Sequence, residues 1–199
     1  MDGVYMLPSP DSSHIPSNDV HDLVPMIDGM ELCLRSYHAR DRDEVRQLYH
    51  HGLLTGAPDT LDAATDLDHI EDVYLRRPQD HFWVAEIDGQ VIGSIAITEH
   101  DKQIGHVRRL RVDPGWKTPH GSEIARILIR KATHHAREHD CLKLVLHTPV
   151  DDDRAIAFLH QLGFEYTRTR QLRGRHLLEF YIDLYARTDR SVSGNVDLE

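Results

Sequence analysis

The sequence predicts an α/β protein built on a mixed, mostly antiparallel sheet with helices on both faces. Two observations predict this class. Stretches of alternating apolar residues follow one another across short turns, which indicates antiparallel hairpins. In the middle of the chain a helical stretch separates two strands, and such a crossover indicates one parallel pair. The 199 residues, 40% of them hydrophobic, are enough for one ordinary domain.

Both ends of the chain are expected to lie outside this domain. Residues 1–30 mix proline, serine, aspartate and glycine without a sustained period, which predicts a flexible arm with a docking turn around 24–27. The domain is expected to cover residues 31–187, and residues 188–199 are predicted to be a disordered tail. The arm is not expected to carry chemistry.

The domain is predicted to begin with a strand and two helices. Alternating leucines after Glu31 indicate the strand. Apolar residues at helical spacing cover 39–54 and again 61–76, and Pro78 ends the second helix. The opposite face of that second helix is strongly acidic.

A hairpin and a third strand follow. The runs FWVAEI (82–87) and VIGSIAI (91–97) are joined by Asp88-Gly89, a pair that permits positive φ and strongly favours a tight hairpin. Residues 103–112 continue the meander as a third strand.

The second half of the chain alternates helices and strands. Gly163 is placed to end its last helix. The predicted order of the whole domain is therefore β-α-α-β-β-β-α-β-α-β-β. The predicted elements of this half are a helix over 124–138, a strand over 142–148, a helix over 153–162, and strands over 164–171 and 176–184.

Composition excludes several classes of protein. The formal net charge of −10 argues against nucleic acid as the main partner, because binding to phosphates needs a basic surface. No apolar run approaches the roughly 20 residues that cross a bilayer, and the N-terminus lacks a basic region followed by an apolar one. We therefore expect a soluble protein without a membrane partner. Cys33 and Cys141 are too few for a disulfide framework, which favours the cytoplasm.

A helical metal site is the weaker interpretation of the histidines near the end of the 124–138 helix. His135 and His139 lie four residues apart, so they share a helix face, and His134 adjoins them. No third or fourth ligand can be identified elsewhere. We expect a solvated helix end and no metal.

Three strings carry a family resemblance: RRLRVDP, LVLHT and RAIAFLHQLGF. Together with the order of elements, they resemble the GNAT superfamily of acyl-CoA-dependent N-acyltransferases over residues 31–185. The resemblance implies transfer of an acetyl group from acetyl-CoA to a primary amine, directly in a ternary complex and without a covalent enzyme intermediate. The acceptor can be a small molecule or a protein amine. Edge strands in so small a sheet also make a homodimer reasonable.

The resemblance also implies where acetyl-CoA binds. The main chain at Leu110, Arg111 and Val112 would pair with the pantetheine arm, as an added strand does. The following loop and helix start would hold the pyrophosphate with backbone N–H groups and the positive end of the helix dipole. The implied contacts from this loop onward are Lys117, His120, Gly121, Ser122, Glu123, Ile124, Ala125, Arg126 and, at the place of a family asparagine, Asp152.

This sequence departs from the family pattern at Glu123 and Leu159. Glu123 takes the place of the first glycine of the phosphate loop, and a carboxylate about 4 Å from a phosphate costs about 1 to 4 kcal/mol. Backbone donors at about 1.5 to 3 kcal/mol each can outweigh this cost, above all if Glu123 turns to solvent. Leu159 replaces the tyrosine acid, whereas Asp152 can still cap its helix. The alternative function is a weak or inactive domain that binds acyl-CoA or another ligand as a sensor.

The sequence offers several groups for proton transfer. His106, on the strand before Val-Asp-Pro, is the first candidate base because an ordinary histidine pKa near 6.5 suits neutral pH. A structural strand histidine is equally compatible with the pattern, since the chain holds 16 histidines. Glu99 and His100 are second candidates for the base, and Tyr166 or Tyr181 for the acid.

An acidic run is predicted to lie at the variable acceptor wall of the family. It could steer a positively charged amine, although a solvated helix face explains the same residues. The run contains Asp59, Asp62, Asp66 and Asp68.

Overall fold

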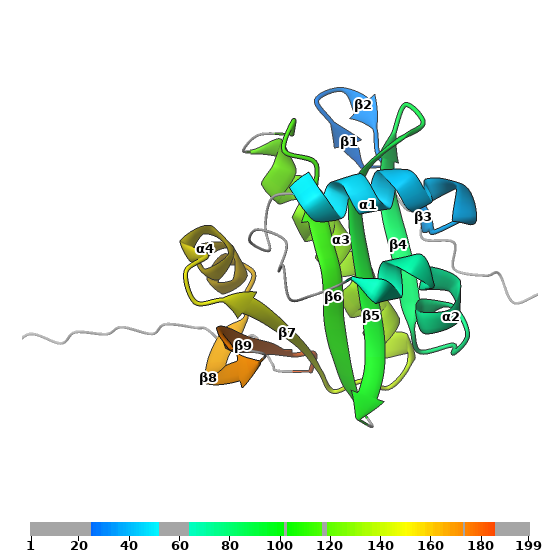
Figure 1. Cartoon of the computed structure of the whole chain (residues 1–199). Coiled ribbons are helices and arrows are strands. Elements are labelled where there is room, and N and C mark those ends of the chain that lie inside the picture. The colour runs from blue at the N-terminus through cyan, green and yellow to red at the C-terminus, as the bar shows by residue number, and fades with distance from the viewer. Residues whose placement is uncertain (1–24, 52–63, 102, 117–118, 173, 186–199) are drawn as a thin grey trace, which may run out of the picture.

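The computed structural model describes residues 25–51, 64–101, 103–116, 119–172 and 174–185 (Figure 1). These residues form a seven-stranded sheet in the order β3-β4-β5-β6-β7-β9-β8 and a two-stranded ribbon, β1-β2. Neighbouring strands of the large sheet are antiparallel except β6 and β7. The strands are β1 (Met26–Ile27), β2 (Met30–Glu31), β3 (Cys33–Ser36), β4 (His81–Ile87), β5 (Gln90–Asp101), β6 (Ile104–Val112), β7 (Lys143–Pro149), β8 (Glu165–Leu172) and β9 (Arg175–Asp183).

Helices lie on both faces of the sheet, so the predicted fold class is confirmed. In Figure 1, α1 and α2 cover one face of the central strands and α3 lies behind them. No helix of the described residues is long and apolar enough to span a membrane. The helical segments are η1 (Ala39–Asp41), α1 (Arg42–His51), η2 (Thr65–Asp68), α2 (Ile70–Tyr74), α3 (His120–Glu138) and α4 (Asp153–Gln161), where η marks a 3-10 turn.

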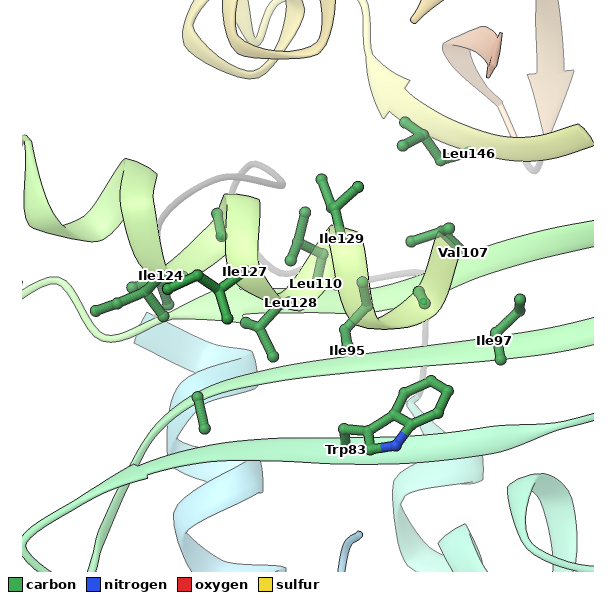
Figure 2. Close-up of a cluster of buried hydrophobic side chains, with 14 of the residues drawn as sticks. Trp83, Ile95, Ile97, Val107, Leu110, Ile124, Ile127, Leu128, Ile129 and Leu146 are labelled. Atoms are coloured by element: carbon green, nitrogen blue, oxygen red, sulfur yellow. The ribbon is translucent and has the colours of Figure 1, made fainter. Parts of the chain in front are cut away.

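Two hydrophobic cores define the two faces of the sheet. The first lies between the sheet and α3, where Ile124, Leu128 and Ile95 belong to one cluster of buried side chains (Figure 2). The second lies under α1 and α2 and contains Phe82 and Ala96. Because neighbouring residues of a strand point to opposite sides, Ile95 and Ala96 enter different cores. We call these sides the α3 face and the α1 face.

The hairpin between β4 and β5 forms as predicted. Asp88 and Gly89 both have positive φ, at 50° and 79°. This geometry matches the twist of the flanking strands, which explains why a local dipeptide could predict it.

The prediction of one continuous helix over residues 61–76 was wrong. Residues 64–76 instead form the short turn η2 and the single-turn helix α2. Ala64 has a left-handed φ of 46° and His69 a φ of −134°, and neither fits an α-helix. Residues 61–63 of the prediction lie outside the described residues, as do residues 52–54 of the first predicted helix.

The N-terminal ribbon begins inside the segment that the sequence assigned to the flexible arm. β1 and β2 pair with one another, and Ile27 is fully buried in the core under α3. Ordered structure therefore starts before residue 31. The docking turn expected around 24–27 overlaps this ribbon, and the first 24 residues lie outside the described part of the chain.

The sheet parts between its two parallel strands. β6 pairs with β7 over three residues, ending at His106 with Val145, whereas β7 continues along β9 to Pro149. Figure 1 shows β7, β9 and β8 swinging away from β6 together with α4. We call the place where β6 and β7 part the opening, and the far half of β6 and the start of α3 lie beside it.

Candidate active site

The helix α3 begins at His120, four residues earlier than predicted. Its first turn therefore contains Gly121, Ser122 and Glu123. The first N–H groups of a helix have no earlier carbonyl to bond, and the helix dipole adds partial positive charge there. This turn is suited to an anion. Lys117 lies outside the described residues.

Gly121 is required by the path of the loop before the helix. A Cβ at this position would lie 2.3 Å from the carbonyl oxygen of Trp116, which is backbone and has little room to move. The backbone of Trp116 therefore lies close against the helix start, where only glycine fits.

The remaining predicted contacts of the phosphate turn divide into exposed and buried groups. Glu123 is exposed, so its carboxylate points to solvent and the expected repulsion of a phosphate is reduced. Ile124 and Ala125 are fully buried in the core and anchor the helix with their side chains. The Nδ1 atom of His120 is buried and has no hydrogen-bond partner among the described residues.

Arg126 connects the turn with α4, and Asp152 caps the start of α4. Arg126 donates from Nη2 to the Oε1 of Gln161 at 3.2 Å and stacks over the ring of Phe158. Asp152 caps α4, since its Oδ1 accepts from the N–H of Ala155 at 3.0 Å, as the sequence predicted. The two helices that flank the opening are thereby joined on one side.

The far half of β6 presents different side chains to the two faces. Leu110 and Val112 are buried in the core under α3. A bulge between Arg108 and Arg111, with Arg109 at a φ of 55°, interrupts the pairing with β5. This bulge turns the guanidinium groups of Arg109 and Arg111 over the ring of Tyr49, on the α1 face.

An ion pair holds the η2 turn against the bulge. The Nε of Arg109 donates to Asp66 at 2.8 Å, and the hydroxyl of Tyr74 donates to the same carboxylate. Burial raises the pKa of Asp66, but the hydrogen bond and charge of Arg109 outweigh it and lower the pKa below its usual value. Burial also raises the pKa of Tyr74.

This pairing shows that two carboxylates of the acidic run are engaged within the fold, and the steering of a cationic amine stays a prediction. Asp66 is engaged by Arg109, and Asp68 forms an ion pair with Arg46 of α1. Their charges are therefore neutralised within the fold. Asp59 and Asp62 lie outside the described residues.

His106 lies on the α1 face at the point where the sheet parts. It pairs with Thr98, two residues beyond Ala96 of the core under α1. Its side chain is half-buried, and its Nε2 is shielded from solvent. The hydroxyl of Thr98 is also buried and has no partner within the described part of the chain.

The structure does not bring the other predicted catalytic residues to His106. Glu99 pairs with Gly105 and so lies on the opposite face, where its Oε1 accepts from the N–H of Gln103 at 3.0 Å. Tyr166 lies on β8, three strand spacings or about 14 Å from β6. It also belongs to the α3 face, packed on Phe180. Both residues were plausible in sequence but are misplaced for proton transfer beside His106.

A family model decides the identity of this domain. Residues 42–164 match the model described as the acetyltransferase (GNAT) family. The chain belongs to the GNAT acetyltransferase family. It is therefore a member of a family of acetyl-CoA-dependent N-acetyltransferases, as the sequence motifs implied.

Relatives and solved structures agree with this assignment. The GNAT chain is 33% identical to N-acetylaspartate synthetase of Homo sapiens over 103 residues, which are 51% of this chain and 33% of that protein. For the Xenopus tropicalis enzyme the identity is 31%, over 51% of this chain and 37% of that protein. The chain thus spans about a third of the length of these curated relatives.

Solved structures show the same fold at low identity. A GNAT-family acetyltransferase from Staphylococcus aureus superposes with a TM-score of 0.66 at 19% identity, covering 77% of this chain and 99% of that one. Spermidine N-acetyltransferase from Vibrio cholerae, in complex with CoA and spermine, gives a TM-score of 0.58 at 16% identity, over 77% of this chain and 95% of that one.

The sequence did not single out a histidine and glutamate pair in this GNAT domain. His147 of β7 and Glu179 of β9 are register partners, and the His147 Nε2 lies 3.1 Å from the Glu179 Oε2. The sign of this pair in the sequence was His147 of the string LVLHT, a titratable residue that directly follows the apolar residues of the strand. The partner could not be predicted because it depends on the pairing of β7 with β9. Among the described residues, no group of three His, Cys, Asp or Glu side chains is arranged to hold a metal ion.

Proposed function

We propose that this GNAT acetyltransferase moves the acetyl group of acetyl-CoA to the primary amine of an acceptor that carries a carboxylate. Transfer is direct, in a ternary complex. The observation that carries the proposal is the parting of β6 from β7 beside the first turn of α3. That arrangement brings a strand edge and a helix N-terminus together at one place.

The acetyl-CoA side of the proposal uses main-chain groups. The N–H groups of the first turn, at His120 to Ser122, would hold the pyrophosphate. The strand from Leu110 to Val112 would line the pantetheine arm, with its N–H groups available to polarise the thioester carbonyl. Leu159 is buried in the core and supplies no acid, so the thiolate leaves without a tyrosine donor.

The acceptor side of the proposal follows from the arginines of β6. Arg108 pairs with Ala96, so it lies on the α1 face, and it is exposed. Burial raises the pKa of Asp66, and the hydrogen bond and charge of Arg109 lower it. The charge of Arg108 is a smaller cause in the same direction, so Arg108 lies near η2. A guanidinium matches the planar geometry of a carboxylate. The name N-acetylaspartate synthetase, borne by the curated relatives, describes an acceptor of that class.

A panel of acceptors tests this proposal by thiol release from acetyl-CoA. L-aspartate and L-asparagine share the α-carboxylate and compare a side-chain carboxylate with its neutral amide, whereas spermidine is a polycation without a carboxylate. We expect kcat/KM for L-aspartate to exceed that for L-asparagine by about tenfold, the equivalent of one charge-assisted hydrogen bond. Arg108→Gln should remove most of this difference, and the exposed Arg130→Gln on α3 should leave it unchanged. Preference for spermidine, or no thiol release with any amine, would contradict the proposal.

A further inference from the structure

His147 lies two residues beyond the point where the sheet parts. Val145 is the last residue of β7 that pairs with β6, and its partner there is His106. Residues two apart in a strand share a face, so His147 lies on the same α1 face as His106. It is the next side chain along that face. It lies beside the opening, where β7 no longer pairs with β6.

Glu179 is a fixed anion behind His147. Its side chain is 9% exposed. Its carboxylate forms ion pairs with the Nε of Arg168 at 2.9 Å and the Nε of Arg170 at 2.5 Å. The hydroxyl of Thr167 donates to it as well, at 3.2 Å. Burial raises the pKa of Glu179, but the hydrogen bonds from Arg168 and His147 and the charge of Arg170 outweigh it and lower the pKa to about 2.

The ionised carboxylate determines which nitrogen of His147 carries the proton. A carboxylate can only accept, so the Nε2 of His147 must donate to it across the 3.1 Å contact. The lone pair of the neutral ring is then on Nδ1. That atom has no recorded hydrogen-bond partner among the described residues and is not sealed from solvent, since the side chain is 32% exposed.

The surroundings keep the ring neutral in the working range of pH. Burial lowers the pKa of His147, Glu179 raises it, and the charges of Arg170 and Arg168 lower it again, with a net decrease. These three side chains, from β9 and β8, are the charged groups that the structure records around the ring. A neutral imidazole with one nitrogen oriented and the other accessible is the arrangement of a general base.

We propose that His147 is the general base that takes the proton from the ammonium of the acceptor, and that Glu179 is its positioning residue. This inference rests on the proposed function of the same opening. It replaces His106, whose Nε2 is shielded from solvent, in the role that the sequence suggested.

The proton and electron pair are conserved through the step. An N–H bond of the ammonium breaks, and its proton passes to Nδ1 of His147. The Nε2–H group of His147 stays hydrogen-bonded to Glu179. The released lone pair of the amine attacks the thioester carbonyl, the C–S bond breaks, and the thiolate leaves with the electron pair. The new amide nitrogen loses its second proton to solvent, the thiolate gains one from solvent, and the imidazolium returns its proton to solvent.

His147→Gln tests the role of the base, because an amide can still donate to Glu179 but cannot accept the proton. We expect kcat to fall by about 100-fold or more, with the KM for acetyl-CoA changed by less than about threefold. In the wild type, kcat/KM should fall at acid pH as His147 is protonated, and this acid limb should be absent in the variant. The matched control is His134→Gln, because His134 forms a His–Glu pair of similar length, 3.2 Å, with Glu138 on the surface of α3.

Glu179→Gln tests the positioning role separately. Removing the carboxylate withdraws the group that raises the pKa of His147, so the acid limb should move to lower pH while kcat decreases. If Glu179 had only a structural role, Glu179→Gln would lower the free energy of unfolding and leave the acid limb of the pH profile at the same pH.

The outcomes separate this inference from the proposed function. Absence of thiol release by the wild type with every amine overturns both. If the wild type is active, but His147→Gln has the same kcat as His134→Gln and retains the acid limb, only the assignment of His147 as the base is overturned. If the variant fails to fold, an NMR titration of the wild type decides: His147 should be the Nε2–H tautomer with a pKa equal to that of the acid limb, and a mismatch overturns the inference.

Discussion

Gly121→Ala is expected to weaken acetyl-CoA binding by at least about tenfold and to lower the free energy of unfolding by about 1 to 3 kcal/mol. The added Cβ would lie 2.3 Å from the Trp116 carbonyl oxygen, so the loop must move away from the helix start. The direction is informative, because glycine to alanine inside a helix otherwise stabilises by about 0.5 to 1 kcal/mol. Urea unfolding and calorimetric titration with acetyl-CoA measure the two effects.

Glu123→Gln is the matched control in the same turn. Its side chain is exposed, so removal of the charge should change acetyl-CoA affinity by only a few-fold, toward tighter binding, and less at high salt. A Gly121→Ala protein that is more stable than the wild type and binds acetyl-CoA equally well would mean that the Trp116 backbone does not lie close against the helix start as described.

Asp66→Asn is expected to lower the free energy of unfolding by about 3 kcal/mol, measured by urea titration. Asp66 and Arg109 are largely buried, with side chains 13% and 7% exposed, so the change removes a buried charge that pairs with the guanidinium of Arg109. The exposed pair of Asp72 and Arg76, at 2.6 Å, provides the control. Asp72→Asn should cost only about 0.3 to 0.5 kcal/mol. Equal losses for the two variants would show that the buried pair does not anchor η2.

The same carboxylate predicts an acid dependence of stability. The pKa of Asp66 is lowered in the folded state, so its contribution is fully present above the unfolded value of about 3.9 and is lost as pH falls through the lower folded pKa. Asp66→Asn should therefore flatten the stability curve in this acid range. A variant that keeps the wild-type slope would assign the acid lability to other groups.

Local signals in the sequence predicted much of the fold. Asp88-Gly89 specified its hairpin, and Asp152 and Gly163 bounded α4, because each acts through a backbone within a few residues of itself. The central strand, helix and strand were recognised from the strings that carry the family resemblance. These elements also form the opening between β6 and β7, where we propose the site.

Long-range pairings could not be predicted in this way. Asp66 meets Arg109, which is 43 residues away, and this contact belongs to a turn that the sequence read as part of a helix. Glu99 and Tyr166 carry suitable groups, but strand register and order place them on the α3 face. The pair of His147 and Glu179 was missed for the same reason, since a period of two identifies the face of a strand and not its partner.

An NMR titration of the ¹⁵N-labelled protein with acetyl-CoA tests the central claim most directly. We predict saturable changes that are largest at the amides of residues 120–122 and 110–112, the two backbone segments at the opening. Saturation at about 100 times the dissociation constant should also raise the free energy of unfolding by about 2.7 kcal/mol. Saturable binding without thiol release from any amine would favour the sensor role. Absence of saturable binding, or changes confined to other parts of the fold, would contradict the account.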